Sequence, residues 1–313
     1  MKINYNNRIV SLPDFIVVGA QKSATTTLYK NLKNNPRIYM PEIKEINFFA
    51  YDNNDIRLNQ YKEYNLGGNF KIITNELEYF NLFTLPDSEN IVLGESSVNY
   101  LYRYNQTISK IKKYYGENSR NLKIIISLRN PIYRAFSSWL MNVRDGFEDM
   151  TFNDALEFLM NNKDSDRLET LNYLEFGLYF KAVLQYKENF NNVHVLLYDD
   201  IIDNFSLEIN KVFEFLDIEN IDKDNISNIK YNVSGIPRIN FLHNLIKSDF
   251  FLKSYIKKKI PNKIAILIKK ILNMNYKKPE IDIQAKNKLI NYYDNDIRNL
   301  ESLIKRDLDS WLK

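Results

Sequence analysis

The segment from Asp14 to Asn34 constrains the fold more than any other part of the chain. It opens with DFIVV, an apolar run rich in β-branched residues that ends at Gly19 and is typical of a buried strand. A polar turn, QKSATTT, leads into a helix predicted over residues 25–34, where Asn34, Asn35 and Pro36 provide the stop signal. A strand, a turn of small residues and a helix in this order direct backbone N–H groups and the positive helix end toward a phosphate.

Three further apolar runs predict strands over residues 91–94, 122–128 and 193–198. Helices are predicted between and after these strands, over residues 104–115, from Pro131 onward, and over about 176–190 and 203–217. Strands separated by helices predict an α/β fold with a mostly parallel sheet, flanked by helices and joined by right-handed crossovers. After about residue 238 the pattern becomes helical and ends in an amphipathic stretch over residues 283–311.

The composition excludes several kinds of catalytic site. The chain has no cysteine, which rules out disulfide scaffolds, thiolate-bound zinc, iron–sulfur clusters and thiol nucleophiles. It has only two histidines, and His194, inside a predicted strand, is interpreted as a hydrogen-bonded core residue. The acidic run Asp199, Asp200 and Asp203 is interpreted as helix capping and not as a metal site. No metal ion is therefore expected.

The net charge of +4 hides an uneven distribution. Nine lysines and no acid lie between Phe250 and Pro279, so the rest of the 313-residue chain is net acidic. This local basicity argues against a protein that coats nucleic acid, and predicts one positive patch. The patch fits a basic amphipathic helix that binds anionic lipid or a polyanionic glycan, and an ordinary solvated helix packed on the domain is the alternative.

The N-terminal stretch MKINYNNRIVSLPDFIVVGA is predicted to form a strand and not a signal peptide, because Pro13 and Asp14 interrupt its apolar run. No run of about 18 uncharged apolar residues occurs, as a membrane-spanning helix would require. We therefore expect an intracellular protein in the cytoplasm, with the inner membrane surface as a second location.

The turn at residues 19–27, GAQKSATTT, resembles a phosphate loop but departs from the nucleotide triphosphatase pattern G-x-x-x-x-G-K-[ST]. Ala24 stands at the position of the second glycine, Thr25 follows it, and the lysine has moved forward to residue 22. The loop is expected to bind a phosphate-like group without the usual magnesium–serine geometry. A polar turn with Thr25 as a helix cap is the alternative that this segment leaves open.

A second segment, SLRNPIYRAFSSW at residues 127–139, favours phosphate binding. Arg129 ends the clearest predicted strand, and Ser137 lies eight residues later, two turns into the next helix. Ligands of parallel sheets bind at that edge, where an arginine fork and a helical serine can hold a second phosphate. Arg134, between them, is interpreted as a solvated or helix-pairing residue.

Together these segments resemble a known family, the sulfotransferases that use 3′-phosphoadenosine 5′-phosphosulfate (PAPS), and most closely the bacterial and heparan-sulfate-type carbohydrate branch. Residues 14–32 are similar to the family's 5′-phosphosulfate loop and residues 126–139 to its 3′-phosphate motif. Four more segments are similar to family motifs: PEIKEINFF (41–49), GESSVNY (94–100), NVSGIPR (232–238) and LESLIKRDLDSW (300–311). The resemblance runs from about residue 13 to 312. It implies one P-loop-like sulfotransferase domain over residues 1–313, in which about 238–313 form a mainly helical C-terminal part.

The resemblance also implies a donor and its binding residues. PAPS would be the sulfuryl donor, with Lys22 on the bridging oxygen and no metal ion. The remaining donor contacts would come from the phosphate loop, the second segment and the late loop, namely Gln21, Ser23, Ala24, Thr25, Thr26, Arg129, Ser137, Ser234, Gly235 and Arg238. Many family members have glycine where this chain has Ala24, and a methyl group is tolerable there if φ is negative.

By the same resemblance, Glu45 would be the general base that takes the proton of an acceptor hydroxyl. Lys44 could stabilise the transferring sulfuryl oxygens, but neighbouring residues on one strand point to opposite sides, so Lys44 ranks lower. The acceptor, a hydroxyl or less favourably an amino group of a glycan or glycolipid, would contact Phe48, Ser97, Asn99 and Tyr100. Family members often carry Thr-Pro or a lysine at positions 97–98, so the acceptor's identity does not transfer.

Two other functions fit parts of this sequence. A nucleoside or nucleotide kinase has a similar strand–loop–helix, but the G-K-[ST] ending and an evident magnesium carboxylate are missing. A membrane-associated binding protein could keep the fold without turnover, but Lys22, Glu45, Arg129 and Ser137 are all present. The sequence therefore favours the sulfotransferase.

Overall fold

A computed structural model describes residues 1–55, 57, 72–84, 90–162, 167–219, 236–237, 276–277 and 279–313. Its centre is a five-stranded sheet in the order β4-β5-β3-β6-β7, in which every neighbouring pair is parallel. The strands are β3 (Phe15–Gly19), β4 (Ile38–Tyr39), β5 (Val92–Ser96), β6 (Lys123–Leu128) and β7 (Asn192–Leu197). The predicted α/β fold with a parallel sheet is confirmed.

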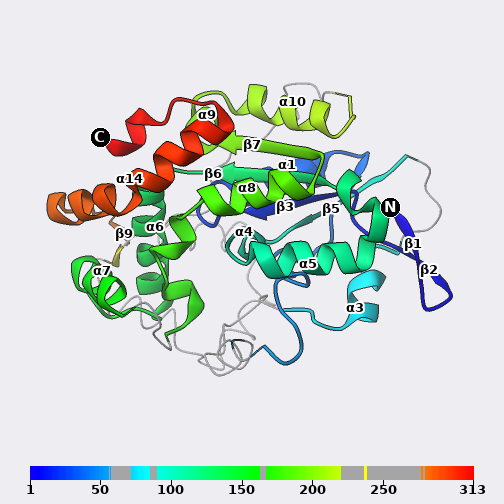
Figure 1. Cartoon of the computed structure of the whole chain (residues 1–313), viewed down its shortest axis with the longest axis horizontal. Helices are drawn as coiled ribbons and strands as arrows, with labels where there is room; N and C mark the ends of the chain where they lie inside the picture. Colours follow the sequence, from blue (N-terminus) through cyan, green and yellow to red (C-terminus); the bar gives the residue numbers. More distant parts are fainter. Residues whose placement is uncertain are drawn as a thin grey trace, which may run out of the picture.

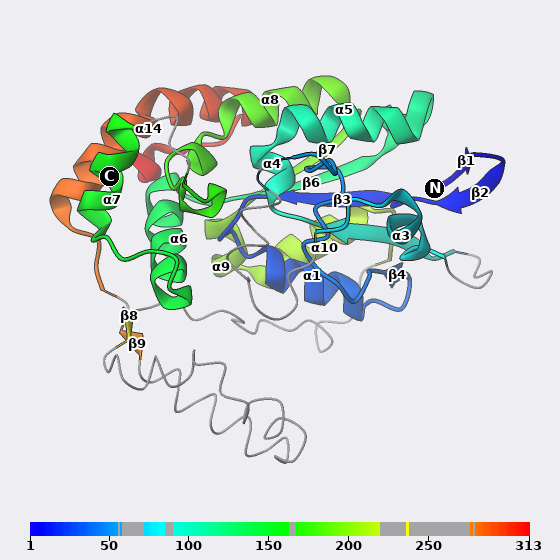
Figure 2. The same cartoon turned by 90° about the horizontal axis from the view of Figure 1, so that it is seen from below.

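Helices cover both faces of this sheet (Figures 1 and 2). One face carries α1 (Thr25–Asn34), α9 (Tyr198–Asp203) and α10 (Phe205–Phe215), and the other carries α4 (Asn99–Tyr102), α5 (Tyr104–Tyr115) and α8 (Phe180–Asn189). At one end of the sheet lie α6 (Pro131–Asp145), α7 (Phe152–Asn161) and α14 (Ile283–Ile304), and α14 packs against α6, α7 and α8. The short helix α3 (Glu76–Asn81) lies near the N-terminus.

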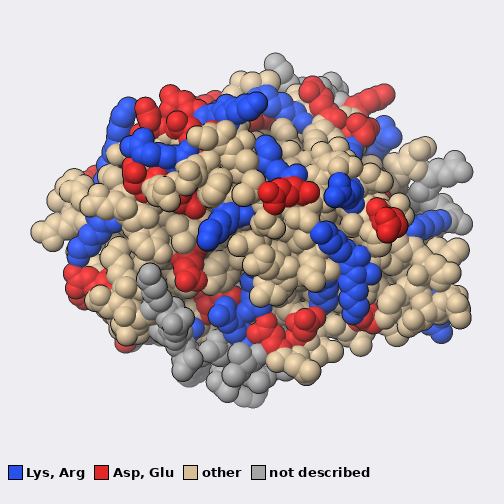
Figure 3. All heavy atoms as spheres, in the orientation of Figure 1, with Lys and Arg blue, Asp and Glu red and all other residues tan. Residues whose placement is uncertain are grey.

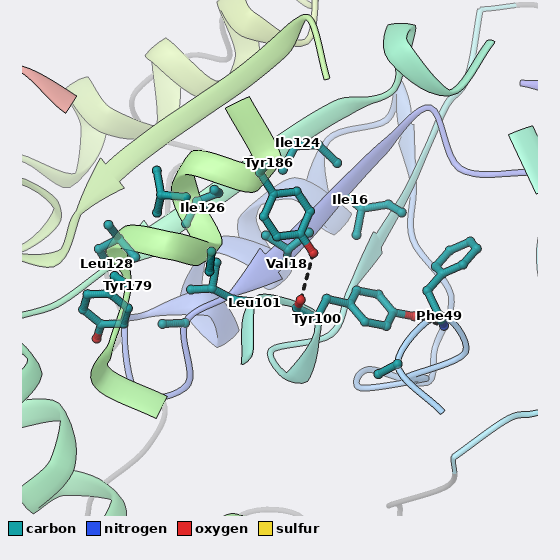
Figure 4. Packing of buried hydrophobic residues seen from close by; sticks show 14 of the residues in the cluster. Ile16, Val18, Phe49, Tyr100, Leu101, Ile124, Ile126, Leu128, Tyr179 and Tyr186 are labelled. Carbon is teal, nitrogen blue, oxygen red and sulfur yellow. Dashed lines mark hydrogen bonds between the residues drawn. The ribbon is translucent and has the colours of Figure 1, made fainter. Parts of the chain in front are cut away.

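The alternation of side chains along β3 divides the core into two layers. Ile16 and Val18 belong to the cluster beneath α5 and α8, while Phe15 and Val17 belong to the cluster beneath α1 and α10. Figure 4 shows the first of these clusters, in which the Tyr186 hydroxyl donates to the backbone oxygen of Tyr100 at 2.8 Å. A strand buried on both faces needs a continuous apolar run, which is why DFIVV was recognisable in the sequence.

The boundaries of the predicted elements agree closely where the pattern was strong. The helices predicted at 25–34 and 104–115 have these bounds in the structure, and the strand predicted at 122–128 begins one residue later. The N-terminal region forms a separate antiparallel hairpin, β1 (Lys2–Tyr5) and β2 (Arg8–Ser11), before β3 begins. The last helix ends at Ile304 and not near 311, because Lys305 adopts a left-handed conformation with φ of 54°.

The C-terminal region is described only in part. Strands β8 (Ile236–Pro237) and β9 (Tyr276–Lys277) form an antiparallel pair, and most of the lysine-rich segment lies outside the described residues, as do Ser234, Gly235 and Arg238. Acidic and basic side chains are interspersed over the face in Figure 3. In the described part of the chain, every helix is too short or too polar to cross a bilayer.

Candidate active site

The loop that leaves β3 is held by a close approach to the turn after β5. Gly19 has φ of +151°, and a Cβ atom there would lie 2.7 Å from Leu101 Cβ and 3.0 Å from the backbone oxygen of Val98. Both the dihedral angle and the space therefore require glycine. This contact joins the predicted phosphate loop to the segment that follows the neighbouring strand.

The loop itself turns sharply at two residues that are not glycine. Lys22 and Ala24 have φ of 69° and 64°, and Ala24 is the N-cap of α1 without a side-chain capping bond. The condition of a negative φ, under which a methyl group was expected to be tolerable at residue 24, is not met, and the alternative of Thr25 as helix cap is wrong because Thr25 is the first residue of the helix. A left-handed alanine costs about 1–2 kcal/mol, which explains why glycine suits this position.

Strand β6 and helix α6 fix the loop from the other side. The Ser127 hydroxyl donates to the backbone oxygen of Ser23, and Arg129 Nη1 donates to that of Lys22 at 3.2 Å. The Ser138 hydroxyl donates to Oε1 of Gln21 at 2.8 Å. The two predicted phosphate-binding segments therefore meet, as parallel strand ends do at the same sheet edge.

The electrostatics of this loop suit an anion. Burial, with a smaller contribution from the neighbouring cations Arg144 and Arg129, lowers the pKa of Lys22 to about 8. Burial also lowers the pKa of Arg129, whose guanidinium lies 4.4 Å from the ring centroid of Tyr198. The Oγ atom of Ser23 is buried without a hydrogen-bond partner among the described residues. Buried polar atoms are normally paired, so a ligand oxygen would satisfy this one.

Glu45 is fixed from two sides. Its Oε2 accepts the backbone N–H of Val98 at 2.7 Å, and its Oε1 forms an ion pair with Lys44. The segment is not a strand: Glu45 has φ of 64°, so the side chains of Lys44 and Glu45 meet instead of pointing apart, and the strand-based expectation is wrong. Val98 therefore binds Glu45 through its backbone N–H and lies against Gly19, the start of the phosphate loop, through its backbone oxygen.

Comparison with known proteins decides the family. A model described as "Sulfotransferase domain" matches residues 12–234, about two thirds of the chain.

The chain belongs to the sulfotransferase family.

Solved sulfotransferases resemble the chain. A sulfotransferase from Alicyclobacillus acidocaldarius is 25% identical with a TM-score of 0.67, over 97% of this chain and 100% of that one. Mouse SULT7A1 complexed with PAP is 17% identical with a TM-score of 0.42, over 72% of this chain and 71% of that one. A sulfotransferase domain from the curacin biosynthetic pathway is 13% identical with a TM-score of 0.44, over 95% of this chain and 99% of that one. The search of curated proteins returned no match.

Family membership has two direct consequences. The protein is a sulfotransferase enzyme, and sulfotransferases of this family use PAPS as the sulfuryl donor. The kinase alternative loses its support, because the strand–loop–helix at residues 14–34 lies within the match to the sulfotransferase family.

The predicted acceptor-binding residues of this sulfotransferase are buried. Phe48, Ser97 and Tyr100 have no exposed surface and Asn99 is 7% exposed. Phe48 stacks on Tyr79 with ring centroids 4.0 Å apart, and Asn99 Nδ2 donates to the Tyr51 hydroxyl at 3.1 Å. The expectation that these four side chains line an acceptor cleft is therefore not met. They are part of the core instead, where Phe48 lies in a cluster of aromatic rings with Phe49, Tyr79 and Tyr114.

Arg134 also differs from expectation. It is fully buried, neither solvated nor paired along its helix, and its Nη2 donates to the backbone oxygen of Tyr173. Its Nε and Nη1 have no partner among the described residues. A buried guanidinium without a carboxylate keeps its positive charge in the interior, near Lys22 and Arg129, whose pKa values it lowers.

The acidic residues Asp199 and Asp200 and the core residue His194 have structural roles. Asp199 accepts the indole N–H of Trp311 at 3.0 Å, and Asp200 pairs with Arg306 at 2.8 Å, so these acids anchor the C-terminus and do not cap α9. His194 stacks on Phe215, but its Nε2 has no partner among the described residues, and burial lowers the pKa of its ring. It is a core histidine, as expected, but not a hydrogen-bonded one.

The structure also describes three more of the predicted donor-binding residues. Thr25 and Thr26 begin α1, and Ser137, 8% exposed, lies on α6 two turns after Arg129. One buried residue of the same region was missed from the sequence, namely Glu95 in β5. A glutamate inside an apolar strand flanked by glycine was the available signal, because an unpaired buried carboxylate is costly.

Proposed function

We propose that this sulfotransferase moves a sulfuryl group from PAPS to a hydroxyl, or less readily an amino group, of a glycan or glycolipid, with Glu45 as general base and without a metal ion. The observation that carries the proposal is the position of Val98, whose backbone N–H binds Glu45 and whose backbone oxygen lies against Gly19 at the start of the donor loop. A base and a phosphate loop that contact the same residue fit in-line transfer, which depends on alignment.

The donor site has groups that fit an anionic nucleotide. Lys22 and Arg129 supply positive charge, and the buried Ser23 hydroxyl supplies an unused hydrogen-bonding group. We assign the 5′-phosphate to the loop at residues 21–26 and the 3′-phosphate to Arg129 and Ser137. PAPS supplies an activated sulfuryl group attached to a phosphate that departs as 3′-phosphoadenosine 5′-phosphate (PAP). Ser234, Gly235 and Arg238 complete this assignment from the late loop.

The chain's own groups carry out the proton and charge transfers. We assign Glu45 to accept the proton of the acceptor hydroxyl as its oxygen bonds to sulfur. A carboxylate is a much weaker base than an alkoxide, so this proton moves late, after attack has acidified the hydroxyl. The Lys22 ammonium stabilises the negative charge that grows on the leaving oxygen. Lys44, which pairs with Glu45, orients the carboxylate before it assists at the sulfuryl oxygens.

The acceptor class and the location follow from the resemblance alone. The heparan-sulfate-type motifs favour a carbohydrate acceptor, and a cytoplasmic enzyme at the inner membrane surface would meet glycolipid precursors there. The lysines of residues 250–279 would bring it to anionic lipid. Retention on anionic vesicles that is equal for the wild type and a variant with these lysines reversed in charge would contradict the membrane part of the proposal.

Calorimetric titration with PAP tests the donor, with ATP plus Mg²⁺ as the comparison and Arg129→Ala as the variant. We expect tight binding of PAP without magnesium, and its loss in Arg129→Ala. A screen of glycan and glycolipid acceptors with PAPS then identifies the acceptor by transfer of labelled sulfate. Preference for Mg-ATP, or no binding of PAP, would overturn the proposal.

A further inference from the structure

We propose that Glu95 is the positioning residue for the general base: its ionised carboxylate holds the backbone of residues 45–49, through two buried hydroxyl groups, in the shape that aims Glu45. The inference rests on the proposed role of Glu45. Glu95 itself is 1% exposed in β5 and touches neither the donor loop nor solvent, so it acts only through other residues.

The first connection runs through Ser97. Its hydroxyl accepts the backbone N–H of Asn47 at 3.0 Å and donates to Glu95 Oε1 at 2.9 Å. Asn47 has φ of 58°, and its side-chain amide donates to the backbone oxygen of Glu45 at 2.9 Å. The carboxylate of Glu95 is therefore two hydrogen bonds away from the turn that carries Glu45.

The second connection runs through Tyr100. Its hydroxyl accepts the backbone N–H of Phe49 at 3.2 Å and donates to the same Oε1 of Glu95 at 2.5 Å. Figure 4 shows the Tyr100 ring extending from α4 toward the backbone of Phe49. The backbone N–H groups of Asn47 and Phe49 are thus both connected, each through one hydroxyl, to the same carboxylate oxygen of Glu95.

A third hydroxyl binds Glu95, that of Tyr79, whose ring packs on Phe48 while its hydroxyl bonds to Glu95 and not to the backbone of this segment. Tyr79, on α3, donates to Glu95 Oε2 at 2.6 Å. Glu95 thus accepts three O–H groups, and within the described part of the chain no cation pairs with it. The ionisable groups that face it are Tyr79 on α3, Tyr100 on α4, Tyr115 at the end of α5 and the carboxylate of Glu45.

The direction of these bonds makes the segment sensitive to the charge of Glu95. A carboxylate only accepts, so Ser97 and Tyr100 can turn their hydrogens toward it and leave their lone pairs for Asn47 and Phe49. A proton on Oε1 would make that oxygen a donor to one of the two hydroxyls, whose own hydrogen must then turn away from Glu95, so the connection from the carboxyl to that backbone N–H is weakened. Burial raises the pKa of Glu95 to about 7, with a further contribution from Glu45, so the ionised form is lost just below neutral pH.

Hydrogen exchange at the amides of Asn47 and Phe49 tests the inference without a known acceptor. In the wild type we expect the protection of both amides to fall as the pH drops below 7. In Glu95→Gln, which keeps the shape and removes the charge, protection should be low at every pH. Glu45→Gln serves as a control that should leave both amides protected.

Turnover supplies a second readout, measured as PAP release from PAPS with water or the best acceptor of the screen. We expect Tyr100→Phe and Ser97→Ala to lower kcat by ~10-fold or more, because they release the base-bearing segment. Tyr79→Phe removes an equally buried hydroxyl that binds Glu95 but makes no hydrogen bond to this segment. At a pH above 7, where Glu95 is ionised, its kcat should therefore stay near the wild-type value. The comparison of Tyr79→Phe with Tyr100→Phe tests the inference even if Glu95→Gln does not fold.

Different failures point to different errors. Equal losses in Tyr79→Phe and Tyr100→Phe, or amide protection independent of pH, would overturn the positioning role. If the wild type does not bind PAP in the titration above, the proposed function itself fails. Protection of Asn47 and Phe49 can still be measured in that case, so the two failures are distinguishable.

Discussion

The two halves of this active site are built on opposite principles. The proposed donor half, around residues 19–25, contains backbone in the left-handed region at Lys22 and Ala24, a cation of lowered pKa, and the Ser23 hydroxyl, which has no hydrogen-bond partner in the part of the chain that the structure describes. In the acceptor half, Glu45 and Glu95 both have hydrogen-bond partners for each carboxylate oxygen. We infer that the donor half is completed by an anion, while the carboxylates of the acceptor half are already hydrogen-bonded without a ligand.

The difference follows from what each half binds. A phosphate brings its own charge and acceptor oxygens, so the protein gains binding energy from cations and hydrogen-bond donors gathered at one place. A general base must be aimed before the proton moves, which favours a rigid, fully hydrogen-bonded support. We therefore expect changes in the donor half to alter binding, and changes in the acceptor half to alter turnover.

The largest expected effect is that of Glu45→Gln on turnover. Removing a general base lowers the rate by about 10²- to 10⁴-fold, while the affinity for PAP should remain that of the wild type because the donor loop keeps its contacts. Steady-state kinetics with PAPS and calorimetry with PAP measure the two quantities. A parallel loss of PAP binding would show that the halves are not separable.

The next effect is that of Lys22→Ala on donor binding. Loss of a charge-assisted hydrogen bond of about 1.5–3 kcal/mol predicts roughly 10- to 100-fold weaker binding of PAP, measured by calorimetry. Arg120→Ala removes a positive charge from an exposed residue before β6 and should bind PAP normally. Wild-type affinity in the Lys22 variant would place the donor elsewhere.

A smaller effect concerns pH and stability. The pKa of Lys22 is about 8 in the folded protein and near 10.5 when unfolded, so the unfolded chain binds more protons between these values. The contribution of Lys22 to the free energy of unfolding should therefore rise from pH 8 to 10.5, and PAP affinity should fall over the same range. Urea unfolding of wild type and Lys22→Met measures the difference. Identical pH profiles for the two proteins would contradict the burial of the ammonium.

The smallest effect is expected for Ala24→Gly. Glycine removes the cost of a left-handed alanine, about 1–2 kcal/mol, but loses more entropy on folding, about 0.5–1 kcal/mol. We expect a net stabilisation of less than about 1 kcal/mol in urea unfolding, with PAP affinity unchanged. A destabilised variant would mean that the methyl group makes contacts that outweigh the strain.

Local patterns predicted the strands and the helix around the proposed donor loop well. A strand buried on both faces, a small-residue turn and a periodic helix depend on neighbours in the chain, so β3, α1 and β6 were recognisable with their loop between them. Arg129 and Ser138 meet this loop because parallel strands end at one edge. The conformation of Ala24 was not predictable, because the sign of φ there depends on how α1 and β6 hold the turn.

The acceptor half shows where local patterns were insufficient. Phe48 and Tyr100 carry the same sequence signal whether they line a cleft or fill a core, and Arg134 resembles any helical arginine until its neighbours are known. Their burial arises from contacts between segments about 40 to 50 residues apart, such as Phe49 with Tyr100 and Tyr173 with Arg134.

The sequence by itself determined the alternation of helices with the four longer strands of the sheet, the absence of thiol chemistry and the identity of the charged groups, since each depends on composition or on short-range periodicity. Only the tertiary structure decided which groups are paired. Glu95 and Arg134 are both buried charges, yet three hydroxyls surround the first while two nitrogens of the second lack a partner among the described residues. The physical reason is that desolvation and hydrogen bonding depend on what packs against a residue, and that is set by segments distant in the chain.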